Sequence, residues 1–557
     1  MSSEKFESFS DSSDDENNFY LPSYDRKASP SQQDYLGAMR GEFIPKNLED
    51  LRMMCCIIHG LRYNEVFAES ESMKEICAKS TNKILARARN ARLIMSDKIP
   101  LMRDDEEKPY CIWHPQVASV DTYRELVHKY PDMKYHVGRA CAVGGYSDLY
   151  RELDLLPDIS IAEEARDNLT VVGSKEIFDL IMCQPTYYAA MDDYTRSVNW
   201  KAPRKAIGLN GDTAVLSSLS VTVEFMKEFQ RTRSHYFNIT EDHCISETSS
   251  VQAHSRPLAP EHVSLLYNPL PLHLPTTNKD ALILYAAYEG NIDRYTRLRR
   301  PVMIPQENEA IVRGIYHHTA FARWCSHQPN VAHSPHLYDI RTAVLARFIM
   351  VNDISRITDQ STATTDTIIG AEYWPEPFLI WWPLIPLELT LREIVRRRPS
   401  MLRQVAMACI AADYFQLWSE LRPEPDPILW EQATNMGTLS ERCQNYYSED
   451  LERRAAEKNI NLLAYAPERD DGFECTRVDK EPTENFLTPD ICADDNFQRD
   501  WMTYRSIYPG SQVSAAQWDL CIAVSEDLRE RVRKNNADDR LDDNCGWPYS
   551  IWNVWGE

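Results

Sequence analysis

Residues 109–153, PYCIWHPQVASVDTYRELVHKYPDMKYHVGRACAVGGYSDLYREL, have a counterpart later in the same chain. Residues 377–421 read PFLIWWPLIPLELTLREIVRRRPSMLRQVAMACIAADYFQLWSEL. The alignment continues without a gap over 109–165 and 377–433, where 21 of 57 positions are identical at a constant offset of 268. Self-similarity at a fixed offset is typical of proteins built from copies of one structural unit.

The identical residues are mostly of types that pack between helices or mark helix ends. They include Pro109/Pro377, Ile112/Ile380, Trp113/Trp381, Pro115/Pro383, Thr122/Thr390, Arg124/Arg392, Glu125/Glu393, Pro131/Pro399, Met133/Met401, Ala140/Ala408, Cys141/Cys409, Tyr146/Tyr414 and Leu153/Leu421. At shorter offsets upstream, Gly60…Phe67-Ala68 matches Gly314…Phe321-Ala322, and 91–95 matches 346–350. Downstream, Tyr187-Tyr188 is aligned with Tyr446-Tyr447. Each copy therefore spans about 160 residues.

Local chemistry predicts a series of short helices in each copy. Thr122-x-x-Glu125 and Thr390-x-x-Glu393 have the pattern of capping boxes, so we expect a helix to begin at each threonine. Pro131 and Pro399 should end these helices, because proline lacks the backbone donor that a helix interior needs.

A second helix is predicted from about Met133 to Val143, and a third, shorter one follows Gly144-Gly145. The inward residues of the second are Val137, Ala140 and Cys141, at helical spacing. Those of the third are Tyr146, Leu149, Tyr150 and Leu153, and Leu155-Leu156-Pro157 should end it. The predicted unit is a stack of helical hairpins.

These residues resemble the ankyrin repeat. Cys141-Ala142-x-x-Gly145-Tyr146-x-Asp148-Leu149-Tyr150 is similar to the ankyrin signature, and residues 283–295, ILYAAYEGNIDRY, fit the same pattern. Ala38-x-x-Gly41 is a fainter match. Neither copy has the Thr-Pro-Leu-His tetrapeptide, and Ala412-Asp413 replaces the glycine pair. The arrangement resembles divergent ankyrin-like proteins of filamentous fungi.

We therefore expect an all-α fold, a helical-repeat solenoid of ankyrin-like type with two duplicated units. The predicted organisation is a Ser-rich acidic disordered tail (1–33), a first unit (34–200), an inter-unit segment with a Pro/His-rich linker (201–278), a second unit (279–465), and an acidic loop, helix and Trp-rich cap (466–557). In the last region Ser511–Lys534 is predicted to be helical. The segment from Trp547 to Trp555 is expected to cap the last repeat.

Composition and charge exclude several classes of function. With 61 basic and 84 acidic residues the net charge is −23, so we expect neither a nucleic-acid nor a membrane partner. There is no leader with a basic then apolar pattern, and no apolar run of about 18 residues. The 14 cysteines are scattered without a CxxC pair, which favours reduced thiols and an intracellular protein, cytoplasmic or nuclear. Ser12 and Ser13 have acids three residues on and are candidate phosphorylation sites.

A search for catalytic, cofactor and metal motifs yields no assignment. Cys55-Cys56-x-x-His59, with Cys325 and His327 in the second copy, is the best metal candidate, but zinc needs three or four converging ligands, so buried free thiols are the preferred interpretation. Adjacent carboxylates at Glu163-Glu164, Asp192-Asp193 and Asp494-Asp495 are interpreted as solvated charge. Trp113, Trp381 and Trp382 are interpreted as core residues, and His317-His318 as helix surface. The arginines of 297–300 and 396–398 are interpreted as complementing helix C-termini.

The leading hypothesis is a non-enzymatic protein-protein interaction or scaffold protein without a cofactor, whose partner and oligomeric state stay open. Repeat stacks recognise partners through many modest contacts along an extended surface. The alternative is an enzyme or small-molecule binder with a site between the two units. It predicts that polar residues such as His59, His114 and Asp193 converge.

Overall fold

The described part of the chain is mostly helical. The computed structural model describes residues 30–44, 50–79, 83–215, 223–224, 239–242, 245–247, 260–266, 268–277, 279–304, 307–328, 337–358, 376–377, 379–381, 383–435 and 441–462. The predicted phosphorylation sites Ser12 and Ser13, Trp382, Asp494-Asp495, the predicted helix Ser511–Lys534 and the Trp-rich segment lie outside these residues.

Helices α1–α10 form what we call the first unit. Their bounds are α1 Gln32–Arg40, α2 Leu51–Tyr63, α3 Glu65–Glu69, α4 Glu71–Lys79, α5 Ile84–Met95, α6 Val120–Lys129, α7 Lys134–Gly144, α8 Ser147–Glu152, α9 Ile159–Asp167 and α10 Val172–Met182, with 3-10 turns η1 Asp105–Glu107 and η2 Pro131–Met133.

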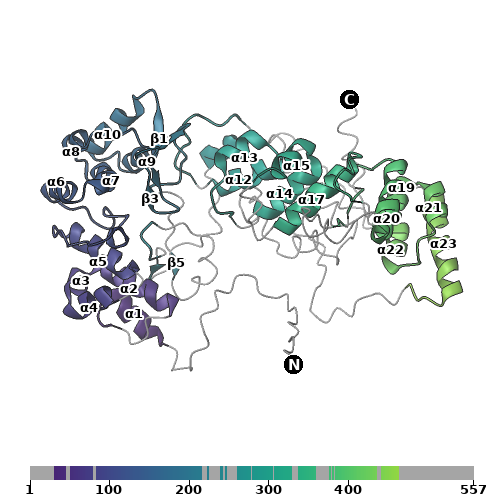
Figure 1. Cartoon of the computed structure of the whole chain (residues 1–557), viewed down its shortest axis with the longest axis horizontal. Coiled ribbons are helices and arrows are strands. Elements are labelled where there is room, and N and C mark those ends of the chain that lie inside the picture. The colour runs from purple at the N-terminus through teal and green to yellow at the C-terminus, as the bar shows by residue number, and fades with distance from the viewer. Residues whose placement is uncertain are drawn as a thin grey trace, which may run out of the picture.

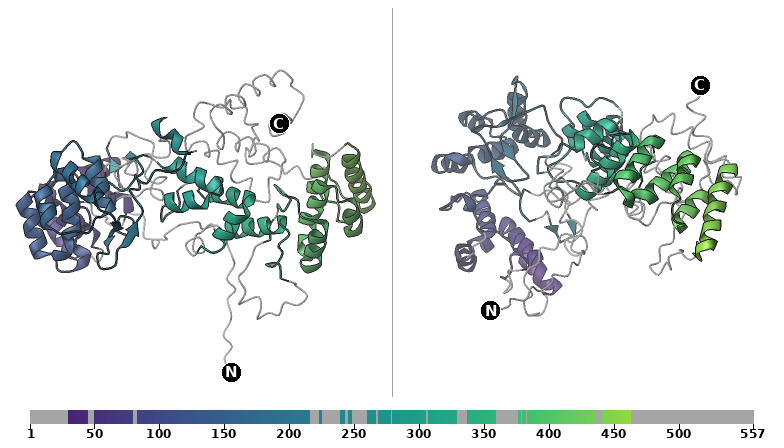
Figure 2. Two further views of the ribbon diagram at one scale, coloured as in Figure 1. Left: turned by 90° about the horizontal axis from the view of Figure 1, so that it is seen from above. Right: turned by 45° about the vertical axis from the view of Figure 1, so that its right-hand side comes forward.

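Helices α12–α23 form the second unit. Their bounds are α12 Asp280–Tyr288, α13 Ile292–Leu298, α14 Glu307–His317, α15 Thr319–Cys325, α17 Leu337–Met350, α19 Glu388–Arg397, α20 Leu402–Ala412, α21 Phe415–Leu421, α22 Pro427–Asn435 and α23 Glu441–Lys458, with 3-10 turns η4 Pro260–Leu266 and η5 Pro399–Met401. Figure 1 shows α1–α10 at one end of an elongated molecule, α12–α17 in the middle and α19–α23 at the other end, and Figure 2 shows the same order from two other directions.

Short strands follow α10. They are β1 Tyr187–Ala189, β2 Met191–Asp192, β3 Ser197–Val198, β4 Arg204–Ala206, β5 Val223–Glu224 and β6 Ile245–Ser246. β1 pairs antiparallel with β4, β2 pairs antiparallel with β3, and β5 pairs parallel with β6. Because β1 begins at Tyr187 while Tyr446-Tyr447 lies in α23, the predicted match between the two tyrosine pairs is wrong as a structural equivalence.

The sequence duplication is reproduced in the helices. α6, η2, α7 and α8 begin 268 residues before α19, η5, α20 and α21, as the alignment requires. Pro131 and Pro399 each follow the end of a helix, and the second predicted helix begins within one residue of the expected position. Val137, Ala140 and Cys141 are fully buried, as the helical spacing predicted.

The predicted capping boxes are wrong in register, because each helix begins before its threonine. Ser119 caps α6, and Thr122 lies inside the helix, where its hydroxyl donates to Asp97 Oδ1 at 2.8 Å. In the second unit Thr390 donates to Asn352 Oδ1, also at 2.8 Å. Asp97 also accepts the backbone N–H of Ser119, and Asn352 accepts that of Leu387. In each unit a side chain from an earlier part of the chain therefore binds the start of the helix.

Two further features recur at equivalent positions. The Tyr146 hydroxyl donates to the Ala118 carbonyl and the Tyr414 hydroxyl to the Pro386 carbonyl, each at 3.0 Å. The turn before each tyrosine is left-handed, with φ of 71° at Gly145 and 55° at Asp413. Aspartate tolerates this conformation better than most residues, so the turn survives the loss of the glycine.

Two helical glycines lie at equivalent close helix crossings of the two units. A Cβ atom on Gly60 of α2 would lie 2.4 Å from the Ala38 carbonyl oxygen of α1, and one on Gly314 of α14 would lie 2.0 Å from the Ala287 carbonyl oxygen of α12. Both contacts are with backbone, which cannot rotate away. Each unit therefore needs glycine at this crossing.

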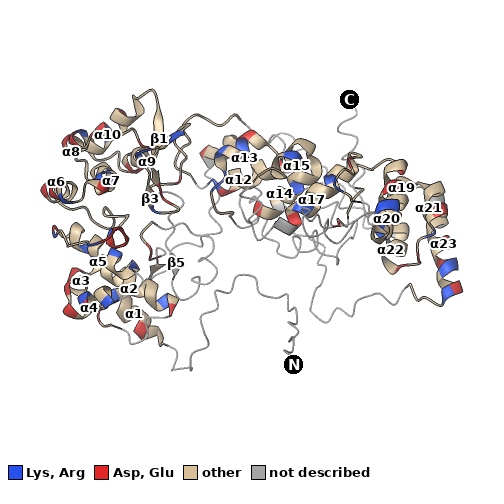
Figure 3. Cartoon of the chain, viewed as in Figure 1, with Lys and Arg blue, Asp and Glu red and all other residues tan. Residues whose placement is uncertain are grey.

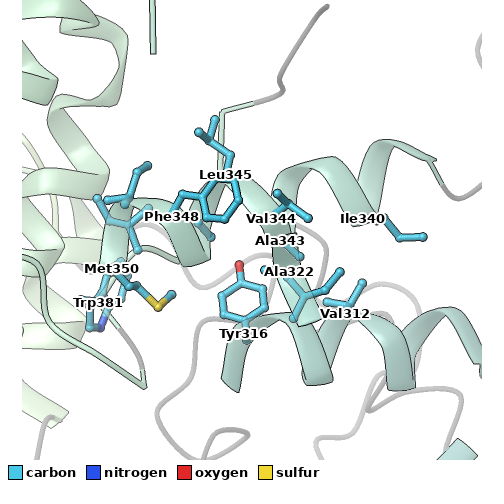
Figure 4. Close-up of a cluster of buried hydrophobic side chains, with 14 of the residues drawn as sticks. Val312, Tyr316, Ala322, Ile340, Ala343, Val344, Leu345, Phe348, Met350 and Trp381 are labelled. Carbon is cyan, nitrogen blue, oxygen red and sulfur yellow. The ribbon is translucent and has the colours of Figure 1, made fainter. Parts of the chain in front are cut away.

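The described core is divided differently in the two units. In the second unit one buried apolar cluster runs from Leu266 to Leu451, whereas the first unit has separate clusters around α2 and around α7. Figure 4 shows part of the second-unit cluster, where Tyr316 of α14 and Phe348 of α17 lie near Met350 and Trp381. Among the described residues, no helix has the length and apolar character needed to cross a membrane.

Replacing Gly314 with alanine should destabilise the chain by about 1–3 kcal/mol, because the added methyl group forces α14 away from α12. Gly60→Ala should have a similar effect in the first unit. The free energy of unfolding, measured by urea denaturation, checks both variants. Ser72→Ala on the exposed face of α4 is the control and should change stability little. Unchanged stability of Gly314→Ala would show that the helices do not cross this closely.

Candidate functional site

A group of large apolar side chains is exposed at the start of α19. Leu387 is 58% exposed and Leu389 is 75% exposed. We use the name apolar surface for these two residues together with three exposed neighbours, Leu384, Ile385 and Phe415. Exposed apolar side chains are of interest where several lie close together, because large apolar patches on soluble proteins often mark contact sites.

The backbone under the apolar surface is fixed by hydrogen bonds. The Leu387 N–H donates to Asn352, and the Pro386 carbonyl accepts the Tyr414 hydroxyl next to Phe415. Leu391 and Ile394 on the opposite face of α19 are fully buried. Since the buried face sets the rotation of the helix, Leu389, which lies on the face opposite Leu391, is held outward.

The first unit is polar at four of the five equivalent positions, Val117 being the exception. An offset of 268 places Gln116, Val117, Ser119, Asp121 and Ser147 where the apolar surface has Leu384, Ile385, Leu387, Leu389 and Phe415. Packing within one unit therefore does not require apolar residues there.

A second candidate is a buried ionic network centred on Arg139 of α7, which is completely buried. Its guanidinium contacts Asp193 at 2.5 and 3.0 Å and Glu164 of α9 at 2.9 Å. The Tyr110 hydroxyl donates to the same Asp193 carboxylate at 2.5 Å. Burial raises the pKa of Glu164 to about 7, and the positive charge of Arg139 opposes this rise.

Glu163, adjacent on α9, binds the loop formed by residues 209–215. Its carboxylate accepts the backbone N–H of Gly211 at 2.7 Å and of Thr213 at 2.9 Å, and also contacts the N–H of Asn210. The interpretation of Glu163-Glu164 as solvated charge is therefore wrong. Both carboxylates are about 1% exposed because they satisfy buried donors. Asp193 is buried too, whereas Asp192 is exposed.

The same loop also contacts the second unit. Asp212 is buried with Lys279 at 3.1 Å and Arg300 at 2.9 Å, and Arg300 also pairs with Asp280. Burial alone would raise the pKa of Asp212, but the two cations lower it. The interpretation of Arg300 as a simple helix-end charge is therefore wrong, because its partners are two carboxylates.

The other predicted helix-end arginines also have specific partners. Arg297 donates to backbone carbonyls of residues 270–272. Arg398 contacts Glu376, and Arg396 and Arg397 contact Glu393. Each of these contacts adds to whatever the arginine contributes at the helix end.

Two of the three residues named for a site between the units come together, but within the first unit. His59 Nδ1 lies 3.2 Å from the buried Asp242 Oδ2, and its ring stacks on Tyr63. The Tyr63 hydroxyl lies 3.2 Å from His114 Nε2, and burial lowers the pKa of His114 to about 4. Asp193 instead joins the network of Arg139. The three side chains thus belong to two clusters of the first unit.

The remaining residues singled out in the sequence are mostly buried. Cys55, Cys56 and Cys325 are buried free thiols, and within the described ranges no group of three or more His, Cys, Asp or Glu side chains is arranged to hold a metal ion. Trp113 and Trp381 are buried, as predicted. His317 is half-buried and so is not simple helix surface, and this burial lowers its pKa to about 2, whereas His318 is exposed, as predicted.

Sequence reasoning missed the ionic network, although the alignment contains a signal for it. Arg139 aligns with Met407 and Glu164 with Gln432, so cation and carboxylate are lost together in the second copy. There Gln432 donates to the Met407 carbonyl at 2.9 Å. Paired replacement of two distant charges indicates that they contact each other.

The described fold and site define a mostly helical protein with a duplicated helical unit. Residues 113–222 match the family model described as the YKP1 C-terminal domain. The chain is also similar to the "Uncharacterized killer plasmid pGKl-2 protein 1" of Kluyveromyces lactis, with 30% identity over 130 residues, 22% of this chain and 52% of that protein. The chain thus spans about half the length of this relative. No solved structure matches the chain.

Arg139→Met should destabilise the protein by about 3–5 kcal/mol, because it leaves Glu164 and Asp193 buried without their cation. Adding Glu164→Gln and Asp193→Asn should recover part of the loss, since neutral groups cost less to bury. Urea denaturation of the single and triple variants measures both effects. A triple variant no more stable than Arg139→Met would contradict an ionic role for the network.

Glu164 should make stability depend on pH. Since its pKa is raised from 4.5 to about 7, the folded protein keeps a proton that the unfolded chain has released. The free energy of unfolding should therefore fall as pH rises from 5 to 7.5, by on the order of 1–3 kcal/mol relative to Glu164→Gln. Denaturation of both proteins across this range checks the sign. Parallel pH profiles would rule out titration of Glu164.

Proposed function

We propose that this chain is a protein-protein interaction or scaffold protein of the ankyrin-like repeat class, which binds a partner protein through the apolar surface of its second unit. The observation that carries the proposal is that five exposed apolar residues replace a largely polar set at the same positions of the first copy. An apolar contact excludes water when a partner covers it, and such contacts form the centre of most stable interfaces.

The helix pairs support the ankyrin-like assignment. α12 is followed by Gly290 in the left-handed conformation and then by α13, whose N-terminus is capped by Asn291. α7 and α8 have the same helix, left-handed residue, helix order around Gly145. This order is similar to the paired helices that the ankyrin-like sequence motifs predict.

The cysteines support an intracellular location, cytoplasmic or nuclear. The eight cysteines whose side chains the structure describes are free, and seven of them are buried. Free thiols are the usual state in reducing compartments. A non-enzymatic role without a cofactor is part of this proposal.

The test compares partner recovery by the full-length tagged chain with recovery by the double variant Leu387→Asp/Leu389→Asp. Two carboxylates on the apolar surface should lower recovery of a specific partner about tenfold or more, which corresponds to about 1.4 kcal/mol. Affinity purification followed by quantitative mass spectrometry measures this ratio.

Val66→Asp is the matched control, since Val66 on α3 is 80% exposed but lies outside the apolar surface. It should leave recovery unchanged, and circular dichroism should show that all variants remain folded. Equal recovery by the double variant and the wild-type chain would overturn the proposed site.

A further inference from the structure

A basic segment stands out in this acidic chain. Residues 194–211 contain four cations, Arg196, Lys201, Arg204 and Lys205, and no aspartate or glutamate. The segment runs through β3 and β4, and Figure 3 shows the basic residues of β4 in blue beside β1. Although the net charge of the chain is −23, this segment is locally positive.

An exposed tryptophan lies between two of the cations. Trp200 is 43% exposed, and its ring lies 5.4 Å from Lys134 Nζ of α7 and 5.7 Å from Lys201 Nζ. Both distances are within the range of cation–π attraction, so the indole holds the two ammonium groups near its surface. Ile207, just past β4, is 69% exposed and adds a second apolar side chain.

Hydrogen bonds hold the backbone of this turn in place. Asn199 accepts the Ala202 N–H and donates to the Ala202 carbonyl, each at 3.2 Å, and the Asn199 N–H donates to Ala190. Pairing of Arg204 with Ala189 anchors the next strand. Trp200 and Lys201 are thus presented by a hydrogen-bonded turn, beside Lys134 of α7 and before Arg204 and Lys205 of β4, and a fixed backbone limits the entropy lost when a ligand binds.

The cations around Trp200 form no ion pair with a described carboxylate, unlike most cations of the first unit. Among the described residues, no carboxylate lies within 4.0 Å of Lys134, Lys201, Arg204 or Lys205. Arg196 differs, because it pairs with Glu241. Among the acids near this segment in sequence, Asp192 accepts the N–H groups of Tyr194 and Thr195, Asp193 pairs with Arg139, and Asp212 pairs with Lys279 and Arg300. Four cations therefore remain to attract an anionic ligand.

We propose that Trp200, Lys134, Lys201, Arg204 and Lys205 form a binding site for an acidic peptide segment of a partner protein, one with an apolar side chain among its carboxylates. Carboxylates pair with the cations, and the arginine offers a bidentate contact. The apolar side chain covers the exposed face of Trp200. We call these five residues the cationic turn.

A peptide fits better than a nucleic acid. The phosphates of a nucleic acid are spaced a few ångströms apart, and a protein needs an extended basic track to neutralise them. Here the cations span one turn of a chain whose overall charge repels a polyanion. Two or three carboxylates on a short peptide need only the local field, which salt screens beyond about 8 Å at physiological strength.

The test uses the full-length chain and a labelled twelve-residue peptide of aspartate and glutamate with two phenylalanines. Fluorescence anisotropy should show saturable binding that weakens at least fivefold between 50 and 300 mM NaCl. Lys201→Glu/Arg204→Glu should weaken it at least tenfold. The control Lys74→Glu/Lys79→Glu, on the exposed face of α4, makes the same change in net charge and should stay within threefold of the wild-type chain.

Trp200→Ala separates the apolar contact from the charges. It should weaken binding of the phenylalanine peptide at least threefold but leave binding of a purely acidic peptide unchanged. The proposal is overturned if the peptide does not bind, if the two double variants lose affinity equally, or if a twelve-base single-stranded oligonucleotide binds more tightly than the peptide. Partner recovery through the apolar surface is measured separately, so failure of either proposal is distinguishable from failure of the other.

Discussion

The arrangement of helices and loops in this protein depends on two adjacent buried carboxylates on α9. Glu163 binds backbone N–H groups of the loop 209–215, and Glu164 binds Arg139. Burying two acids in an apolar core is unfavourable unless every oxygen finds a donor, so the loop cannot leave without exposing or stranding charge. Once held there, the loop presents Asp212 to Lys279 and Arg300 of the second unit.

The two copies have used the same helices for different purposes. The first copy places polar groups in its interior because it has to hold the strands and loop that follow α10. The second copy has Met407 and Gln432 at the corresponding positions and forms a continuous apolar core. Its apolar residues extend to the outside at α19, where the first copy is polar. Duplication thus kept the backbone hydrogen bonds and changed the side chains that reach beyond the unit.

Sequence reasoning located most helices but not the contacts that join them. Pro131, Pro399 and Gly145 act on their own neighbours in the chain, so helix ends near them were predicted to within a residue or two. The start of α6 was misplaced because Ser119 is the N-cap, whereas the Thr122 hydroxyl is bound by Asp97, which lies 25 residues earlier in the chain.

The buried network was missed for the same reason, since Arg139 and Asp193 are 54 residues apart and a pair of adjacent acids usually lies at the surface. The exposure of the apolar surface could not be predicted either, because Leu389 and Leu391 are the same residue type on opposite faces of one helix.

The contacts of the loop 209–215 restrict how the two units can move relative to each other. Glu163 holds it from one side, and Lys279 and Arg300 hold its Asp212 from the other, so reorientation of the units must break buried ion pairs. The cationic turn and the apolar surface, on different units, are therefore kept at a nearly constant separation. A single partner carrying both complementary features would bind as a bivalent ligand. Its second contact would form at a high effective concentration, and two weak sites would act as one strong one.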